Sequence, residues 1–131
     1  MHLPEDDQKF LEERGYDWSI HPGDSQGGFL VIRNFDVNGG GFSPSSTDLM
    51  IRIPPQYNMA PLDMWYCDPP IRLAATGQFA QASEVTEAHL GRNWQRFSRH
   101  LPAGVWRPGI DGLRTFMPFI WRELQGLSRK T

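Results

Sequence analysis

The sequence predicts an α+β domain in which one helix at each end of the chain flanks an antiparallel, four-stranded meander. Apolar, β-branched or aromatic runs bounded by turn residues occupy the first half of the chain, and such runs are typical of meander strands. Apolar residues three or four positions apart mark the C-terminal part, which is the spacing of a helix packed on a core. The 131 residues, 39% of them apolar, fit a single domain over 1–131 with a sizeable core.

The N-terminal helix is expected over 3–14. Pro4 lies near its start and the acidic run Glu5–Asp7 lies in its first turn. Both favour a helix, because proline presets the φ angle and carboxylates stabilise the positive end of the helix dipole. Gly15 is expected to end the helix.

Four strands are expected next, over 16–21, 28–35, 47–53 and 63–67. The glycine run Gly39–Gly41 lacks the spacing and the basic residue of a phosphate-binding loop, so it is interpreted as a turn. The third strand alternates apolar and polar residues, as a half-exposed strand does. Prolines flank the fourth strand and keep it brief. Residues 71–92 are weakly patterned and fit either a loop or a short helix.

The C-terminal helix is marked by a stripe of apolar residues: Leu113, Phe116, Met117, Ile120, Trp121, Leu124 and Leu127. Asp111 is the expected N-cap of this helix. A proline in a helix interior costs about 3 kcal/mol. Pro118 therefore predicts a kink or a start of the helix after it.

Composition excludes several classes of protein. A single cysteine, Cys67, rules out an intramolecular disulfide framework and a four-cysteine zinc site. The histidines lack the spacing of metal ligands, so no metal and no cofactor are expected. The N-terminus is acidic where a signal peptide is basic, and no run of apolar residues is long enough to cross a bilayer. The expected location is the cytoplasm, without a membrane association.

Several short motifs, in this order, resemble those of ubiquitin-conjugating (E2) enzymes. The third strand ends in Pro55-Gln56-Tyr57-Asn58, similar to the proline- and tyrosine-containing turn of that fold, and Trp106-Arg107-Pro108 resembles the motif before its second helix. With Asp63-Met64-Trp65, Asp68-Pro69 and the block from Trp94 to His100, nearly the whole chain is similar to the bacterial prokaryotic E2 family E. The resemblance implies a UBC-like fold, with Tyr57, Trp106 and Pro108 as structural residues.

The same resemblance implies a function. Members of the family are typically encoded beside ubiquitin-like proteins, an E1-like adenylating enzyme and a JAB-type metallopeptidase. The protein would accept the C-terminal carboxyl of a ubiquitin-like protein from an E1 partner and transfer it to a target protein. In ordinary E2 enzymes the nucleophilic cysteine lies about eight residues before the tryptophan, and in this chain that position holds Ser98. Cys67 lies 39 residues before Trp106, so it does not match.

Ser98 and His100 are therefore the candidate catalytic pair. Residues two apart on an extended segment project to the same side, and a serine needs a base to remove its proton. Asn93 or His89 are candidates for a supporting polar group or an oxyanion site, in place of the absent histidine-proline-asparagine signature. The alternative is that Ser98 is a turn hydroxyl bonded to backbone and His100 a surface residue.

Cys67 has two interpretations. It is either a small buried hydrophobic residue, as free cysteines usually are, or the carrier of a thioester in a rebuilt active site. The neighbouring Asp68 disfavours a thiolate.

A basic cluster completes the pattern. From Ala88 to Ile110 there is no acidic residue, but there are four arginines: Arg92, Arg96, Arg99 and Arg107. They are expected to stabilise an oxyanion or to face an acidic partner surface. Interleaved aromatics also suggest nucleic-acid binding, but the net charge of −2 and the presence of only two lysines argue against it. A second hypothesis for function is a non-catalytic module on the same fold that binds the ubiquitin-like protein or the E1.

Overall fold

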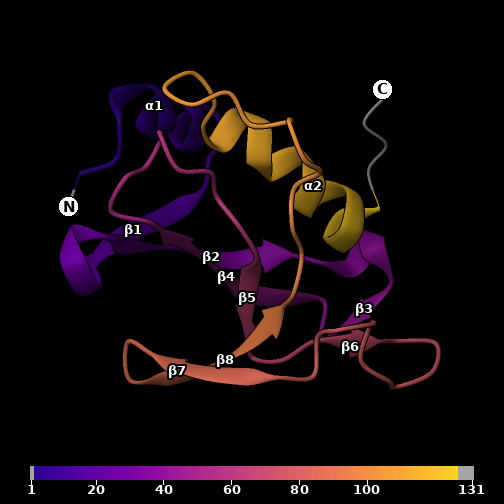
Figure 1. Cartoon of the computed structure of the whole chain (residues 1–131). Helices are drawn as coiled ribbons and strands as arrows, with labels where there is room; N and C mark the ends of the chain where they lie inside the picture. The colour runs from indigo at the N-terminus through magenta and orange to yellow at the C-terminus, as the bar shows by residue number, and fades with distance from the viewer. Residues whose placement is uncertain (1, 127–131) are drawn as a thin grey trace.

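The computed structural model describes residues 2–126 and shows two layers, helices over an antiparallel sheet (Figure 1). The N-terminal helix α1 (Glu5–Glu13) and the C-terminal helix α2 (Leu113–Gln125) cover one face of the sheet. The predicted α+β class, with one helix at each end, is confirmed. No helix among the described residues is long and apolar enough to cross a membrane.

The predicted meander forms, and each strand lies within two residues of its expected bounds. Its strands are β1 (Asp17–Pro22), β2 (Gly28–Asp36), β4 (Ser46–Ile53) and β5 (Trp65–Asp68). They pair antiparallel in that order. Two short 3₁₀ turns, η1 (Asp24–Gln26) and η2 (Asn38–Gly40), flank β2, and β3 (Phe42–Ser43) pairs with β6 (Arg72–Leu73) in a separate small sheet.

The main sheet is larger than the sequence predicts, because a hairpin extends it. The hairpin consists of β7 (Thr86–His89) and β8 (Arg92–Phe97), and the strand order becomes β1-β2-β4-β5-β8-β7. Among the described residues the main sheet therefore has six strands: the four of the predicted meander and the two of this hairpin. β7 falls in the segment whose pattern fitted only a loop or a short helix.

The main core lies between the sheet and the two helices. The side chains on this side include Leu30, Ile32, Leu49, Ile51, Cys67 and Phe97 from the sheet, with Phe10, Leu11, Phe116, Met117, Ile120 and Leu124 from the helices. Alternation along the strands turns every second residue to this face.

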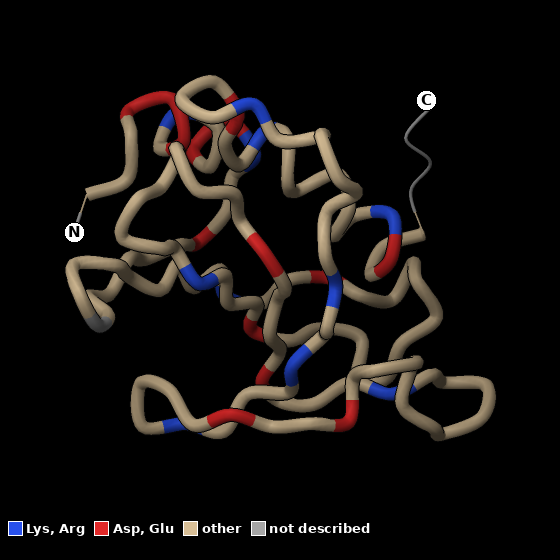
Figure 2. The backbone as a smooth tube through the Cα atoms, viewed as in Figure 1, with Lys and Arg blue, Asp and Glu red and all other residues tan. Residues whose placement is uncertain are grey.

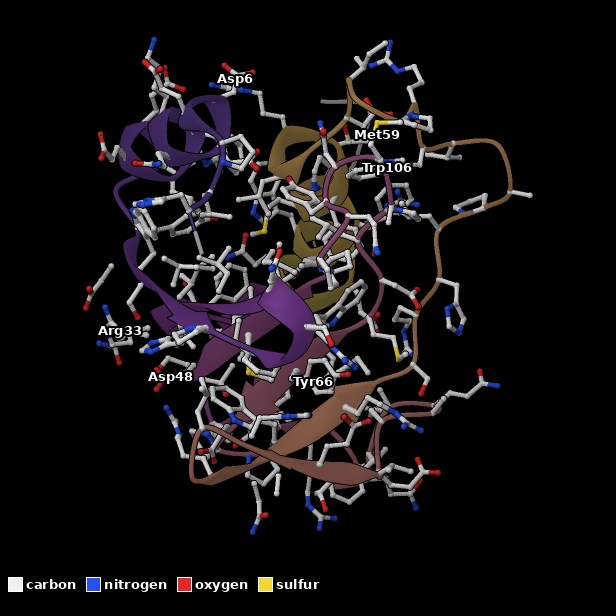
Figure 3. All side chains as sticks on the ribbon, turned by 60° about the vertical axis from the view of Figure 1, so that its left-hand side comes forward. Asp6, Arg33, Asp48, Met59, Tyr66 and Trp106 are labelled. Atoms are coloured by element: carbon white, nitrogen blue, oxygen red, sulfur yellow. The ribbon has the colours of Figure 1, made fainter. Side chains whose placement is uncertain are left out.

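A second, smaller cluster lies on the opposite face of the sheet. Val31, Met50, Tyr66 and Trp94 are all buried there. Figure 3 labels Tyr66 on this face, above the β7–β8 hairpin. The His89 ring of β7 contacts the Phe29 ring of β2, with centroids 5.0 Å apart, and the Trp94 indole N–H donates to the His89 carbonyl. The sheet therefore curls until its sixth strand in order meets its second.

The start of α2 differs from the expectation. Asp111 is not the N-cap: the cap position is Gly112, and the Leu113 N–H donates to the Asp7 carboxylate of α1. A Cβ on Gly112 would lie 2.7 Å from that carboxylate, so a side chain at this position would displace it. The helix also begins before Pro118 rather than after it. Leu127, the last residue of the predicted stripe, lies outside the described residues.

The Gly39–Gly41 run forms a turn, as predicted, and it packs on the C-terminal end of α2. A Cβ on Gly39 would lie 2.6 Å from the carbonyl oxygen of Gln125, and a Cβ on Gly40 would overlap the carbonyl of Leu124. The absence of side chains lets the two backbones approach.

Candidate active site around Ser98

Ser98 lies immediately after β8, where the chain leaves the sheet, and its side chain is half-buried. Its backbone N–H donates to the Ala82 carbonyl at 3.1 Å. Its hydroxyl oxygen accepts a hydrogen bond from Nε of Arg96 at 3.2 Å. Ser98 Oγ is thus held from the side of the sheet opposite the helices.

Arg96 is itself held by the carboxylate of Glu87, on the neighbouring strand β7. Nη1 of Arg96 donates to Oε2 of Glu87 at 2.9 Å, and the other carboxylate oxygen lies 2.9 Å from Nε2 of His89. Burial raises the pKa of Glu87, but the hydrogen bonds to His89 and Arg96 outweigh it, so this pKa lies below its ordinary value. We call Glu87, His89, Arg96 and Ser98 the Glu87 cluster.

His100 is directed elsewhere. Its Nδ1 lies 2.7 Å from Oδ1 of Asp63, in the segment before β5, and its side chain is 67% exposed. Within residues 2–126, Ser98 and His100 share no hydrogen bond. In the part of the chain that the structure describes, Ser98 therefore contacts Arg96 and His100 contacts Asp63, but Ser98 and His100 do not hydrogen-bond to each other.

The two supporting candidates lie away from the Ser98 hydroxyl. Asn93 is exposed and pairs with Ala88 across the hairpin, on the opposite face of β8 from Arg96. Nε2 of His89 contacts Glu87 rather than Ser98, and the His89 ring lies against Phe29 and Tyr66.

Cys67 is fully buried in the main core, on β5, with an exposed fraction of 0%. It pairs with Leu49 on one side and Gln95 on the other. Burial raises the pKa of its thiol well above the ordinary value. A neutral thiol without exposed surface is a poor nucleophile for a protein-sized substrate.

The four arginines do not form an unpaired basic patch. Arg92 binds Asp48 and Asp68, Arg96 binds Glu87, Arg99 binds Glu123, and Arg107 binds Asp111. Figure 2 shows acidic positions beside the basic ones along the fold. The acids that bind Arg92 and Arg99 lie 24 or more residues away in sequence, whereas Glu87 and Asp111 lie just outside the acid-free segment 88–110. Each of the four guanidinium groups is therefore paired with a carboxylate.

The residues expected to be structural occupy one corner, near the start of α2. Tyr57 donates its hydroxyl proton to Asp7 at 2.6 Å, and Nε1 of Trp106 donates to the Asn58 carbonyl at 2.9 Å. The Tyr57 and Trp106 rings lie 6.2 Å apart, and Figure 3 shows Trp106 close to α2. Pro108 is exposed in the loop that follows.

A comparison with protein-family models decides the relationship. The model described as Prokaryotic E2 family E matches residues 3–126, almost the whole chain. The chain belongs to the Prokaryotic E2 family E. Membership of this family supports a general role for the protein in ubiquitin-like conjugation. Searches of curated proteins and of solved structures give no match.

In this family E protein a pocket of about 310 Å³ adjoins the segment after Ser98. Its walls are formed by residues of β5, of the segment 99–101 and of α2: Trp65, Arg99, His100, Leu101, Phe116, Phe119, Arg122 and Glu123. The pair between Arg99 and Glu123, with both N···O distances at 2.6 Å, ties the segment to α2. Among the described residues no group of three or more His, Cys, Asp or Glu is arranged to hold a metal ion.

Sequence reasoning missed three charged residues of this site. Glu87 had a partial signal, because it lies two residues before the candidate His89. The extended conformation that brings the two side chains together comes only from the structure. Asp63 and Glu123 had none, since they reach His100 and Arg99 only through the tertiary fold.

Proposed function

We propose that this protein receives a ubiquitin-like protein from an E1-like enzyme in the cytoplasm and passes it to an amine of a target protein, with the acyl group carried on Ser98 as an oxyester. One contrast carries the proposal: the lone thiol of Cys67 is fully buried, whereas Ser98 is half-buried and its hydroxyl oxygen contacts a guanidinium. The residues directly after Ser98, Arg99 to Leu101, line a pocket. Ser98 also holds the sequence position that the family resemblance implies for the nucleophile.

The reaction would have two steps. In the first, Ser98 Oγ attacks the thioester carbonyl on the E1 enzyme; the C–O bond forms, the C–S bond breaks, and the thiolate leaves. In the second, the target amine attacks the same carbonyl carbon and Ser98 Oγ leaves. A base is needed for the proton of the serine or of the amine.

His100 is the proposed base. Its Nδ1 lies against the Asp63 carboxylate, and this arrangement favours the tautomer in which Nε2 is the free acceptor, as in serine hydrolases. Catalytic hydrogen bonds often tighten only when substrate is bound, so His100 would approach Ser98 or the amine in the complex with the ubiquitin-like protein.

The test is an intact-mass measurement after incubation with ATP and with the E1-like and ubiquitin-like proteins encoded nearest to this gene. The expected result is an adduct that survives thiol reductant and is absent from Ser98→Ala. Cys67→Ala is the matched control and should still form the adduct. An adduct that reductant removes, and that Cys67→Ala abolishes, would replace the oxyester by a thioester on Cys67.

A second candidate is a non-catalytic module that binds the ubiquitin-like protein or the E1. It is favoured by the absence of a hydrogen bond between Ser98 and His100 among the described residues. If Ser98→Ala and Cys67→Ala both leave conjugation intact while the protein still binds the ubiquitin-like protein, this candidate is correct.

A further inference from the structure

The Ser98 hydroxyl oxygen has one side-chain partner among the described residues, and that partner is a cation. Nε of Arg96, two residues earlier and on β8, donates to Oγ at 3.2 Å. We propose that Arg96 is a catalytic residue that stabilises negative charge on Ser98 Oγ during transfer, and that Glu87 is the positioning residue that fixes Arg96. This inference rests on the proposed Ser98 oxyester.

The guanidinium is fixed at two points. Nη1 binds Glu87 while Nε binds Ser98, so one planar group spans the carboxylate and the hydroxyl. The side chains of Arg96 and Glu87 are 30% and 27% exposed, respectively, which shelters the pair from water.

Glu87 is held in turn. Nε2 of His89 lies 2.9 Å from one of its oxygens. Burial of Tyr66 and the nearby Glu87 carboxylate raise the pKa of the Tyr66 hydroxyl, which therefore stays protonated beside it. Arg96 therefore needs little rearrangement when charge develops on Oγ, which is the condition for electrostatic stabilisation of a transition state.

The chemistry of an oxyester calls for a group that stabilises negative charge on the serine oxygen. A serine alkoxide is far more basic than a cysteine thiolate, so it is the poorer leaving group. When the acceptor amine attacks the acyl carbon, the N–C bond forms, the C–Oγ bond breaks, and the electron pair remains on Oγ. The Nε–H of Arg96 stabilises that charge until the proton released by the amine restores the hydroxyl. The same contact would assist the loading step by stabilising Oγ as it loses its proton.

The experiment separates loading from discharge. The Ser98 adduct is formed, freed of E1 and ATP, and mixed with free lysine as the acceptor; the loss of the adduct is followed by intact mass in a single turnover. Arg96→Ala should slow discharge about 100-fold, the order found when one donor to a developing oxyanion is removed. Glu87→Gln should slow it less, because the guanidinium remains but is held less firmly.

Two further variants guard against a purely structural effect. Arg96→Lys keeps the charge and should fall between wild type and Arg96→Ala. Arg33→Ala is the matched control, because Arg33 also bridges a carboxylate, Asp17, and a serine hydroxyl, that of Ser19, on β1. It should discharge at the wild-type rate. Guanidinium ion, below denaturing concentration, should partly restore the rate of Arg96→Ala and leave Arg33→Ala unchanged.

The outcomes distinguish the two proposals. If the wild-type protein forms no Ser98 adduct, the proposed function fails and this inference fails with it. If the adduct forms but Arg96→Ala discharges it at the wild-type rate, the role of Arg96 is overturned while the oxyester stands. Equal slowing in Arg96→Ala and Arg33→Ala, or no recovery with guanidinium, would also overturn the role of Arg96.

Discussion

Replacing Tyr57 by phenylalanine removes one hydrogen bond from Asp7, the carboxylate that joins α1 to α2. The Tyr57 hydroxyl donates to the Asp7 carboxylate at 2.6 Å, and the same carboxylate accepts from the Leu113 N–H at 3.1 Å. Asp7 is only 5% exposed. A hydrogen bond to a charged group contributes about 1.5–3 kcal/mol, so Tyr57→Phe should lower the free energy of unfolding at pH 7 by about 2 kcal/mol. For a domain of this size, that corresponds to a melting temperature lower by roughly 7 °C.

The pH dependence of this loss identifies the carboxylate as the partner. Burial raises the pKa of Asp7 above its ordinary value, and the hydrogen bond from Tyr57 opposes that rise. Without Tyr57 the folded-state pKa rises further, so the variant loses more stability than wild type as pH increases through that range. Below the unfolded-state pKa the carboxyl is neutral, and the cost should fall to about 1 kcal/mol, that of a neutral hydrogen bond.

The measurement is urea unfolding of both proteins at several pH values. Tyr16→Phe is the matched control, because its hydroxyl accepts a neutral hydrogen bond from Nε1 of Trp121 at 2.9 Å. That control should cost about 1 kcal/mol at every pH. A cost of Tyr57→Phe that is independent of pH, or larger in acid, would refute the reasoning.

The other predictions concern buried and closely packed positions. The Cys67 thiol should not react with a disulfide reagent in the native protein, and it should react at once in denaturant; rapid native labelling would contradict its burial. Gly40→Ala should destabilise the protein by about 1–3 kcal/mol, because its Cβ would overlap the Leu124 carbonyl, and an unchanged urea midpoint would show that η2 adjusts freely. The ion pair with Arg107 lowers the pKa of Asp111 to about 2. The stability that Asp111 contributes is therefore present above its ordinary pKa and lost as pH falls through about 2. The difference in free energy of unfolding between wild type and Asp111→Asn should vanish at that pH. A difference that persists in acid would assign another role to Asp111.

Sequence periodicity predicts the two helices and the three longer meander strands because each is long enough to show its period. β5 has only four residues, but it is a buried aromatic run that prolines bound. β7 is equally short and is missed because it is partly exposed and has no such run. Its turn adds to the difficulty: Leu90 and Gly91 both have positive φ, as two-residue hairpin turns require, but leucine is not a residue that such turns favour. The hairpin is held to the rest of the sheet by Trp94 of β8, whose side chain is buried with Val31, Met50 and Tyr66. Local pattern does not reveal these contacts.

The candidate site shows a similar limit. The alternation rule places Arg96 and Ser98 on one side, and they are in contact. It fails to place His100 beside Ser98 because the strand ends at Phe97 and the chain then turns toward Asp63. The carboxylates that neutralise Arg92 and Arg99 lie 24 to 44 residues away in sequence, so no local window could indicate them. The partners of Arg96 and Arg107 lie within nine residues, just outside the acid-free segment.

The curl of the sheet has a consequence for self-association. An edge strand with a free row of backbone groups is a template for pairing with another chain. β7 is such an edge, but the curl that brings His89 onto Phe29 turns it away from the plane of the other strands. At the opposite edge, β1 begins with Asp17, whose carboxylate pairs with Arg33, and ends with Pro22, which has no N–H to offer. Both edges of the six-stranded sheet are therefore poorly suited to strand-to-strand aggregation.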